Sequence, residues 1–372
     1  MKDFSDLPIH VKNIENLTVL EDSTHSTKTV KFEKERVFDD SLHIETIRDI
    51  RTDENGLIYI AAESWGRRMV YVFNEDGTVA DSLGQMGTGD AYGDFQSVNS
   101  LFTEKDTLFV LDNQLKRVTT FFDENGAKIY FTFDNNLPYP DGISPDEFEL
   151  IPFSIINSNS YLVVFRQVRD PAYEPEGILY LYILEVNESI EWTNITGMPD
   201  LSWLVGDYAG SPYAFTLQMP ETSIFHHRSN NRVYAAHTSE FFIKRYSFSG
   251  ELEKAYYFPF ERASMIVSEI NHPRFSHNRQ VLRVRESADY PDHWPVIYSM
   301  VSDKNNRLWI STITENRAQL EWWIIDDDAE KLLTRFTWPF GREIIHINGD
   351  EVYTVEKNDM GFEIVVRYKL DF

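Results

Sequence analysis

A short unit that recurs along the chain is the feature that most constrains the fold. Each copy begins with a polar turn, and a short run rich in β-branched and aromatic residues follows, a pattern typical of a strand entered from a turn. Six copies align on Leu57, Leu108, Tyr161, Arg232, Arg307 and Glu351. A second β run follows each copy, and most copies continue through another polar turn into a further run.

Repeated units of three or four antiparallel strands are typical of a β-propeller. Sustained helical periodicity is almost absent. We therefore predict an all-β fold: a single-domain six-bladed propeller of four-stranded blades over residues 13–372, after an N-terminal tail at 1–12. The last unit ends after its third strand, and two β runs near the N-terminus, 16–20 and 29–38, have no unit of their own. One of these two runs is expected to close the ring as the outer strand of the last blade, which removes an unpaired sheet edge.

The first two units resemble NHL-type repeats. The matching residues are Asp112, Arg117, Val118, Phe122, Asp123 and Gly126 in the second unit and Arg68, Val70, Phe73 and Gly77 in the first. Glu63 stands where that pattern usually has Asp, and the resemblance fades after residue 129. It implies similarity to the six-bladed propellers that many bacteria export, often as lipoproteins. Such a resemblance implies a fold and a compartment, and leaves the activity open.

A glycine-rich stretch at residues 83–101 has the look of a phosphate loop. A dinucleotide loop requires a helix after it, and a Walker loop requires Gly-Lys-Ser/Thr. Here a β run follows, and the lysine motif is missing. The stretch is therefore predicted to be a crossing between blades, with Phe95 as its anchor.

Charge and cysteine content narrow the partners. The chain has 60 acidic and 35 basic residues, a net charge of −25, which disfavours nucleic acid. With no cysteine, disulfides, thiol nucleophiles and Cys-ligated zinc are excluded, and an oxidising compartment is tolerated.

The first 20 residues lack the apolar core of a signal peptide, and no run could span a membrane. We expect an extracytoplasmic monomer, periplasmic or on the cell surface, whose export segment and possible lipid anchor lie outside this chain.

No catalytic residues are predicted, because neither G-x-S-x-G nor H-E-x-x-H occurs. His226 and His227 are neighbours on an expected inner strand, so they should point to opposite faces, one packed between blades and one near the channel. A calcium ion on the axis would need converging oxygen ligands. The aligned inner strands give one row of Arg48, Asn99, Pro152, Ser223, Tyr298 and Arg342. The next row is Asp49, Ser100, Phe153, Ile224, Ser299 and Glu343.

Neither row is a carboxylate ring, so no metal site is predicted. Arg48 and Arg342 could receive an anionic group such as a carboxylate. The favoured alternative is that they form structural ion pairs with Asp49 and Glu343.

Three long segments interrupt the repeat, at residues 165–177, 192–221 and 260–295. The second and third link blades and should share one face, and such long loops are often functional. The second offers Trp203, Tyr208 and Tyr213, which could stack on sugars or pack over the rim, and the third is rich in arginine. The predicted ligand-binding residues are Arg48, Asn99, Tyr298, Arg342, Trp65, Arg67, Asp112, Arg166 and His237.

The leading functional hypothesis is a non-enzymatic propeller that binds a small molecule, a glycan or a protein, without a cofactor. The alternative is a hydrolase, lactonase or lyase with Ca²⁺ on the axis. Three or more Asp, Glu, Asn or His side chains converging on the axis would favour the enzyme, and closed ion pairs or apolar groups there would favour the binding protein.

Overall fold

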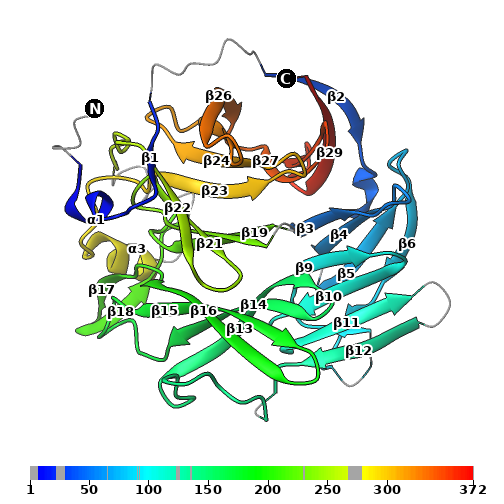
Figure 1. Cartoon of the computed structure of the whole chain (residues 1–372), viewed down its shortest axis with the longest axis horizontal. Coiled ribbons are helices and arrows are strands. Elements are labelled where there is room, and N and C mark those ends of the chain that lie inside the picture. The colour runs from blue at the N-terminus through cyan, green and yellow to red at the C-terminus, as the bar shows by residue number, and fades with distance from the viewer. Residues whose placement is uncertain are drawn as a thin grey trace.

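A computed structural model describes residues 7–21, 30–64, 66–89, 91, 93–122, 126–134, 136–228, 231–266 and 279–371. Six antiparallel sheets, each containing a run of four paired strands, surround a common axis (Figure 1). The predicted six-bladed β-propeller is thus confirmed. Among the described residues, no helix has both the length and the apolar character needed to cross a membrane.

Blades 1 to 3 each take four strands that are consecutive in sequence, with the innermost strand first. Blade 1 contains β3 (Thr46–Thr52), β4 (Ile58–Ser64), β5 (Arg67–Phe73) and β6 (Val79–Leu83). Blade 2 contains β9 (Val98–Glu104), β10 (Thr107–Asp112), β11 (Arg117–Phe122) and β12 (Gly126–Thr132). Blade 3 contains β13 (Phe148–Asn157), β14 (Ser160–Gln167), β15 (Ile178–Val186) and β16 (Ile190–Pro199). The first residues of the predicted insertion at 192–221 are therefore part of a regular outer strand.

Blades 4 and 5 also contain four consecutive strands with the innermost strand first, and blade 6 takes its outer strand from the N-terminal region. Blade 4 contains β19 (Ser223–Arg228), β20 (Arg232–His237), β21 (Phe242–Ser247) and β22 (Leu252–Tyr257). Blade 5 contains β23 (Ile297–Ser302), β24 (Arg307–Ile313), β25 (Gln319–Asp326) and β26 (Lys331–Pro339). Blade 6 contains β27 (Glu343–Asn348), β28 (Glu351–Lys357), β29 (Glu363–Asp371) and, from the N-terminal region, β2 (Lys31–Val37).

The N-terminal strand β2 closes the ring, as predicted for one of the two early β runs. It pairs antiparallel with β29, from Lys31 opposite Asp371 to Val37 opposite Val366. The other early run behaves differently: β1 (Leu17–Val19) extends blade 4 by pairing parallel with β22. The helix α1 (Ile9–Lys12) precedes it. Residues 1–6 of the predicted tail lie outside the described residues.

The glycine-rich stretch is a crossing from blade 1 to blade 2. Its two short strands, β7 (Gln85–Met86) and β8 (Asp94–Phe95), pair parallel to each other. Phe95 is fully buried in the core between the blades, which confirms its anchoring role. The Arg117 guanidinium of β11 fixes the crossing in place, because it donates hydrogen bonds to the carbonyls of Gly89 at 2.9 Å and Asp94 at 2.6 Å.

Replacing Gly84 tests how tightly this crossing is built. Gly84 has φ +78°, and a Cβ atom there would lie 2.2 Å from the Phe95 ring. A left-handed backbone costs about 1–2 kcal/mol for a residue with a Cβ atom, and overpacking adds about 1–3 kcal/mol. We expect Gly84→Ala to lower the free energy of unfolding by about 2–5 kcal/mol in urea titrations. In Gly93→Ala the new Cβ would meet its nearest neighbour at 3.6 Å, so this control should stay within about 1 kcal/mol. Equal losses in the two variants would contradict the crossing geometry.

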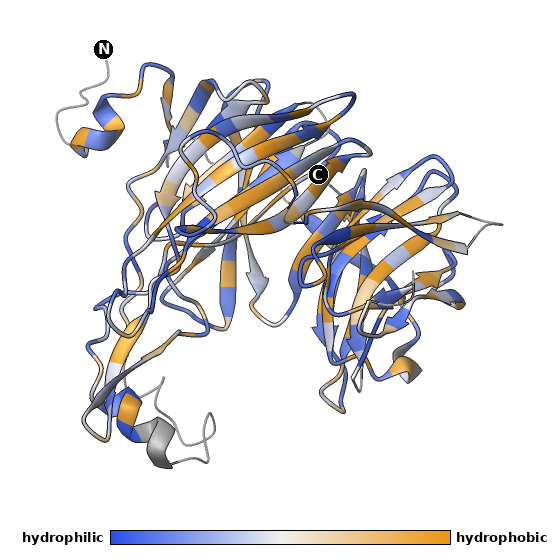
Figure 2. Cartoon of the chain, turned by 90° about the horizontal axis from the view of Figure 1, so that it is seen from below, coloured by the Kyte–Doolittle hydropathy of each residue, from blue (hydrophilic) through white to orange (hydrophobic). Residues whose placement is uncertain are grey.

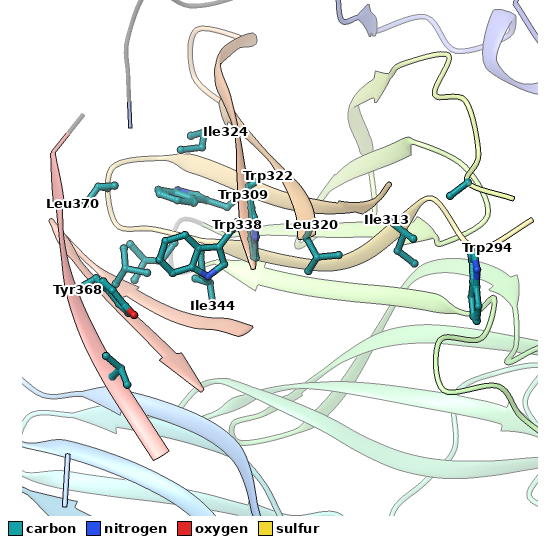
Figure 3. Close-up of a cluster of buried hydrophobic side chains, with 14 of the residues drawn as sticks. Trp294, Trp309, Ile313, Leu320, Trp322, Ile324, Trp338, Ile344, Tyr368 and Leu370 are labelled. Carbon is teal, nitrogen blue, oxygen red and sulfur yellow. The ribbon is translucent and has the colours of Figure 1, made fainter. Parts of the chain in front are cut away.

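A tryptophan-rich core joins blades 5 and 6. Trp309 and Trp322 are fully buried, and Trp338 is nearly so. Phe32 of β2 packs on Trp338 with ring centroids 4.4 Å apart, so the closing strand is tied into the same cluster. Figure 3 shows Leu320, Ile313 and Trp294 in succession at the other end of the cluster.

An arm projects from the blades on one face of the propeller (Figure 2). It consists of the hairpin β17 (Leu204–Tyr208) and β18 (Ser211–Phe215), which packs on the helix α3 (Arg279–Glu286). The Asp207 N–H donates to Ser287 Oγ at 2.7 Å. A Cβ atom on Gly206 would lie 2.0 Å from the Val284 carbonyl oxygen, so glycine permits the close approach. The two long inter-blade segments therefore meet and form one structure.

Candidate functional site

Five of the six inner strands carry one extra residue at a matching level, which interrupts their pairing with the next strand. The extra residues are Arg48, Asn99, Phe153, Tyr298 and Ile345. Such β-bulges change the direction of a side chain and are common next to active sites. The strand β19 of blade 4 pairs without interruption.

The bulges correct the predicted first row of axial residues. Arg48, Asn99 and Tyr298 do share a level, as expected. In blade 3 the equivalent residue is Phe153 and not Pro152. In blade 6 it is Ile345, because Arg342 precedes β27. The predicted rows require every inner strand to pair with the next strand in the same register. The bulges shift that register by different amounts in blades 3 and 6.

Arg48 and Arg342 form ion pairs, but with other carboxylates than predicted. Arg48 Nη2 lies 3.6 Å from Glu63 Oε1, and Arg342 Nε lies 3.4 Å from Glu356 Oε2. Asp49 is 6% exposed and instead contacts Arg51 Nη1 at 2.8 Å. Burial raises the pKa of Asp49, and Arg51 opposes that rise. Asp49 also accepts the Leu101 N–H at 2.8 Å, a bond that fixes it inside the channel wall.

Two neutral histidines flank the same arginine. His227 Nε2 lies 3.0 Å from Ser154 Oγ, and burial together with the Arg51 charge lowers the His227 pKa to about 4. Burial and Arg51 likewise lower the pKa of His346 to about 3. His226 Nε2 contacts Ser302 Oγ at 2.7 Å, on blade 5. The adjacent histidines thus reach opposite neighbouring blades, in keeping with the predicted alternation.

Two carboxylates and a phenol lie together at the level of the bulges. Glu363 Oε2 accepts the Ile47 N–H at 2.7 Å. Burial raises the pKa of Glu343, and the nearby Glu363 raises it further. Burial and these two carboxylates raise the pKa of Tyr298 to about 12. In the part of the chain that the structure describes, no group of three or more His, Asp or Glu side chains is placed to hold a metal ion.

Asp112 has a structural position in blade 2. It is fully buried, and it accepts backbone N–H groups from Gln96, Ser97, Gln114 and Leu115 at 2.6–3.1 Å. These bonds tie the end of β10 to the crossing that precedes the blade. Asn99 lies beside this junction, where its Oδ1 accepts the Ser97 hydroxyl at 2.8 Å.

The other predicted residues lie elsewhere. Arg67 is exposed and lines a cavity of about 680 Å³ beside the glycine-rich crossing. Trp65 falls outside the described residues. Arg166 Nε lies 3.1 Å from Asp200 Oδ1, and Asp200 lines with His237 a separate cavity of about 510 Å³. Burial lowers the pKa of His237. The structure therefore distributes those predicted residues that it describes over several positions and does not gather them into one site.

The best-formed candidate site is a cavity of about 620 Å³ between the arm and blade 5, called here the arm cavity. Its apolar walls are Leu217, Met219, Trp294, Ile313, Leu320 and Phe340. Its polar wall residues are Thr216, Gln218, Arg285, Arg317 and Gln319. Pockets of about 300–1,000 Å³ with mostly apolar walls and a few polar groups are typical small-molecule sites.

The arm cavity has a fixed floor. Trp294, Ile313 and Leu320 are 6%, 3% and 1% exposed and belong to the core of blades 5 and 6 (Figure 3). Arg262 holds the segment beside the floor, because its Nε–H donates to the Trp294 carbonyl at 3.1 Å. The floor is therefore formed by the fold itself and requires no ligand to shape it.

Sequence reasoning located the two inter-blade segments but missed most of the cavity. Arg285 and Trp294 lie in the long, arginine-rich segment 260–295. Ile313, Leu320 and Phe340 come from ordinary hairpins and connections of blade 5. Nothing in their local sequence signals that the arm folds over them. Of the three aromatic residues predicted to bind sugars or cover the rim, Tyr208 and Tyr213 are exposed on the hairpin, with ring centroids 6.3 Å apart.

Comparison with known proteins identifies the fold and no closer family. No protein-family model and no curated protein matches the sequence. A member of the DUF4221 family from Bacteroides vulgatus has a similar structure, with TM-score 0.50, 9% identity, and coverage of 92% of this chain and 98% of the other. An exported protein from Bacteroides fragilis has TM-score 0.48 and 13% identity, over 96% of this chain and 100% of the other. Virginiamycin B lyase from Staphylococcus aureus has TM-score 0.45 and 11% identity, over 92% and 100%. At these identities the likeness concerns the fold alone.

Proposed function

We propose that this chain is a non-catalytic binding protein that holds a small molecule in the arm cavity. The observation that carries the proposal is the cavity itself, about 620 Å³ of space between the arm and blade 5. Its apolar floor is already ordered by the core, so binding needs little rearrangement there. The arm also lies where the two long inter-blade segments meet, and long loops on a rigid scaffold commonly carry binding functions.

Ligand retention by a cavity-blocked variant tests this proposal. Gln319 lines the arm cavity, and a tryptophan in its place would occupy part of the space. The matched control is Thr337→Trp, which places the same side chain at an exposed position of the outer strand β26. Both proteins and the wild type are incubated with a small-molecule extract of bacterial cells, desalted, and examined by native mass spectrometry.

The wild type and Thr337→Trp are expected to retain the same small molecule. Gln319→Trp is expected to lose at least about 90% of it, because the tryptophan fills space that the ligand needs and a tenfold loss in affinity corresponds to only about 1.4 kcal/mol. Thermal melts of the three proteins show whether each is folded. Retention by Gln319→Trp at the level of the control, or no retained molecule in any folded protein, would contradict the proposal.

We also propose that the protein works outside the cytoplasm, as a monomer. Two features support the location. The sequence lacks cysteine, so it has no thiol that an oxidising environment could oxidise. Its resemblance to NHL-type repeats implies similarity to the six-bladed propellers that many bacteria export. Fractionation of producing cells is expected to recover it from the periplasm or the cell surface. Recovery from the cytoplasmic fraction alone would contradict this part of the proposal.

A further inference from the structure

The charged side chains among the described residues that line the arm cavity are all basic. The protein carries 60 acidic and 35 basic residues, so acidic side chains outnumber basic ones in the chain as a whole. The described lining of this cavity nevertheless includes Arg285 and Arg317 and has no Asp or Glu. An arginine such as Arg285, in a wall whose described residues include no carboxylate, favours an anionic guest.

Both arginines are held against aromatic rings. The Arg285 guanidinium carbon lies 5.9 Å from the Phe215 ring centroid, and that of Arg317 lies 5.8 Å from the Trp294 ring centroid. Such stacking leaves the edge of the Arg285 guanidinium available to donate hydrogen bonds. Among the described residues, no carboxylate forms an ion pair with Arg285. Its charge is therefore available to a ligand.

The indole N–H of Trp294 is a second donor in the wall, and it finds no acceptor among the described residues. Trp294 is 6% exposed, and its Nε1–H makes no hydrogen bond with the described residues. A buried indole N–H normally finds a partner, and leaving such a group unpaired costs about 1–3 kcal/mol. A ligand oxygen is the kind of group that would complete it.

We infer that the arm cavity binds an amphiphilic carboxylate: a small molecule with one carboxylate head and an apolar body. The head is held by Arg285 and accepts the Trp294 Nε1–H. The body packs on the apolar walls, in particular Leu217, Ile313 and Leu320, which gain from the removal of apolar surface from water. This inference rests on the proposed function and names the chemical class of its ligand.

Matched probes separate the contribution of the head from that of the body. Octanoate and octanol have the same apolar chain, and only octanoate carries the charge. Isothermal titration of the full chain is expected to show octanoate binding at least about tenfold more tightly than octanol, the size of a single charge-assisted hydrogen bond. Arg285→Gln is expected to remove that preference and leave octanol affinity unchanged.

A second arginine in the last turn of α3 supplies the control. Arg283 is exposed and does not line the cavity, so Arg283→Gln makes the same change in net charge and should keep the full preference for octanoate. Its result separates a specific contact from a general effect of charge.

Each outcome decides the inference. Equal binding of octanoate and octanol, or equal loss in the two arginine variants, would overturn the carboxylate assignment and leave the proposed function standing. If folded wild-type protein binds neither probe and also retains no small molecule in the mass-spectrometric experiment, the inference and the proposed function both fall. Thermal melts of each variant establish that it is folded.

Discussion

Asp327→Ala is expected to lower the free energy of unfolding by about 3–5 kcal/mol, because removing one partner leaves buried charges unpaired. Asp327 is 1% exposed and ties blade 5 to blade 4. Its Oδ1 accepts hydrogen bonds from Tyr256 at 2.6 Å and Arg245 at 2.9 Å. Its Oδ2 accepts from Arg232 at 2.5 Å and Tyr234 at 2.7 Å. Urea denaturation followed by tryptophan fluorescence measures the loss.

The adjacent carboxylate gives a matched control. Asp328 also contacts Arg232, at 3.0 Å, but its side chain is 52% exposed. Exposed ion pairs contribute about 0–1 kcal/mol, so Asp328→Ala should stay within that range. Similar losses in the two variants would show that burial does not distinguish the two sites, and would contradict the assignment of Asp327 as the tie between the blades.

The contribution of Asp327 should also depend on pH. Burial raises its pKa, but hydrogen bonds from Tyr256, Tyr234 and Arg245 outweigh burial and hold the pKa below its ordinary value. A carboxylate with a lowered pKa in the folded state stabilises fully above the unfolded pKa of about 3.9 and loses that effect as the pH falls through the folded value. The difference between wild type and Asp327→Ala is therefore expected to be constant near neutral pH and to shrink below about pH 4.

Removing the closing strand β2 is expected to be the second large perturbation. Without it, β29 presents an unpaired edge and the Phe32 ring leaves Trp338 and Tyr368, whose centroids lie 4.4 and 6.4 Å away. Loss of an aromatic side chain from a core costs about 3–5 kcal/mol, and Phe32 is partly buried. We expect a chain that starts at Phe38 to lose at least about 3 kcal/mol of unfolding free energy and to aggregate through the open edge.

The comparison that isolates β2 uses two shortened chains. One starts at Val30, so that α1 and β1 are removed and β2 is kept. The other starts at Phe38. Their urea midpoints and elution volumes are compared. Equal midpoints and a monomeric elution volume for both chains would show that β2 does not close the ring.

The fold could be predicted from the sequence because its signals are local. A polar turn and a β-rich run recur six times, and each hairpin can be recognised without knowledge of its neighbours. The pairing partners of the two early β runs depend on distant segments of the chain. Both have strand character, but only the complete ring shows that β2 joins β29 and that the three residues of β1 join β22.

The candidate site could be predicted only in part, because its geometry depends on distant segments. The bulges at Arg48, Asn99 and Tyr298 fall where the aligned strands placed a row, but the pairing of Arg48 with Glu63 depends on which side chains are buried. The arm cavity combines Arg285 of one insertion with Leu320 of a blade hairpin. No sequence periodicity connects such residues, since they meet only after the arm packs on the blade.

The occupancy of the arm cavity tests the central claim most directly. Crystals of the full chain are soaked with a straight-chain carboxylate that carries bromine at its apolar end, and the anomalous signal locates the bromine. The account predicts a bromine peak against the wall formed by Leu217, Ile313 and Leu320, with the carboxylate at Arg285. A bromine peak at another surface, or bound carboxylate whose head lies away from Arg285, would contradict it.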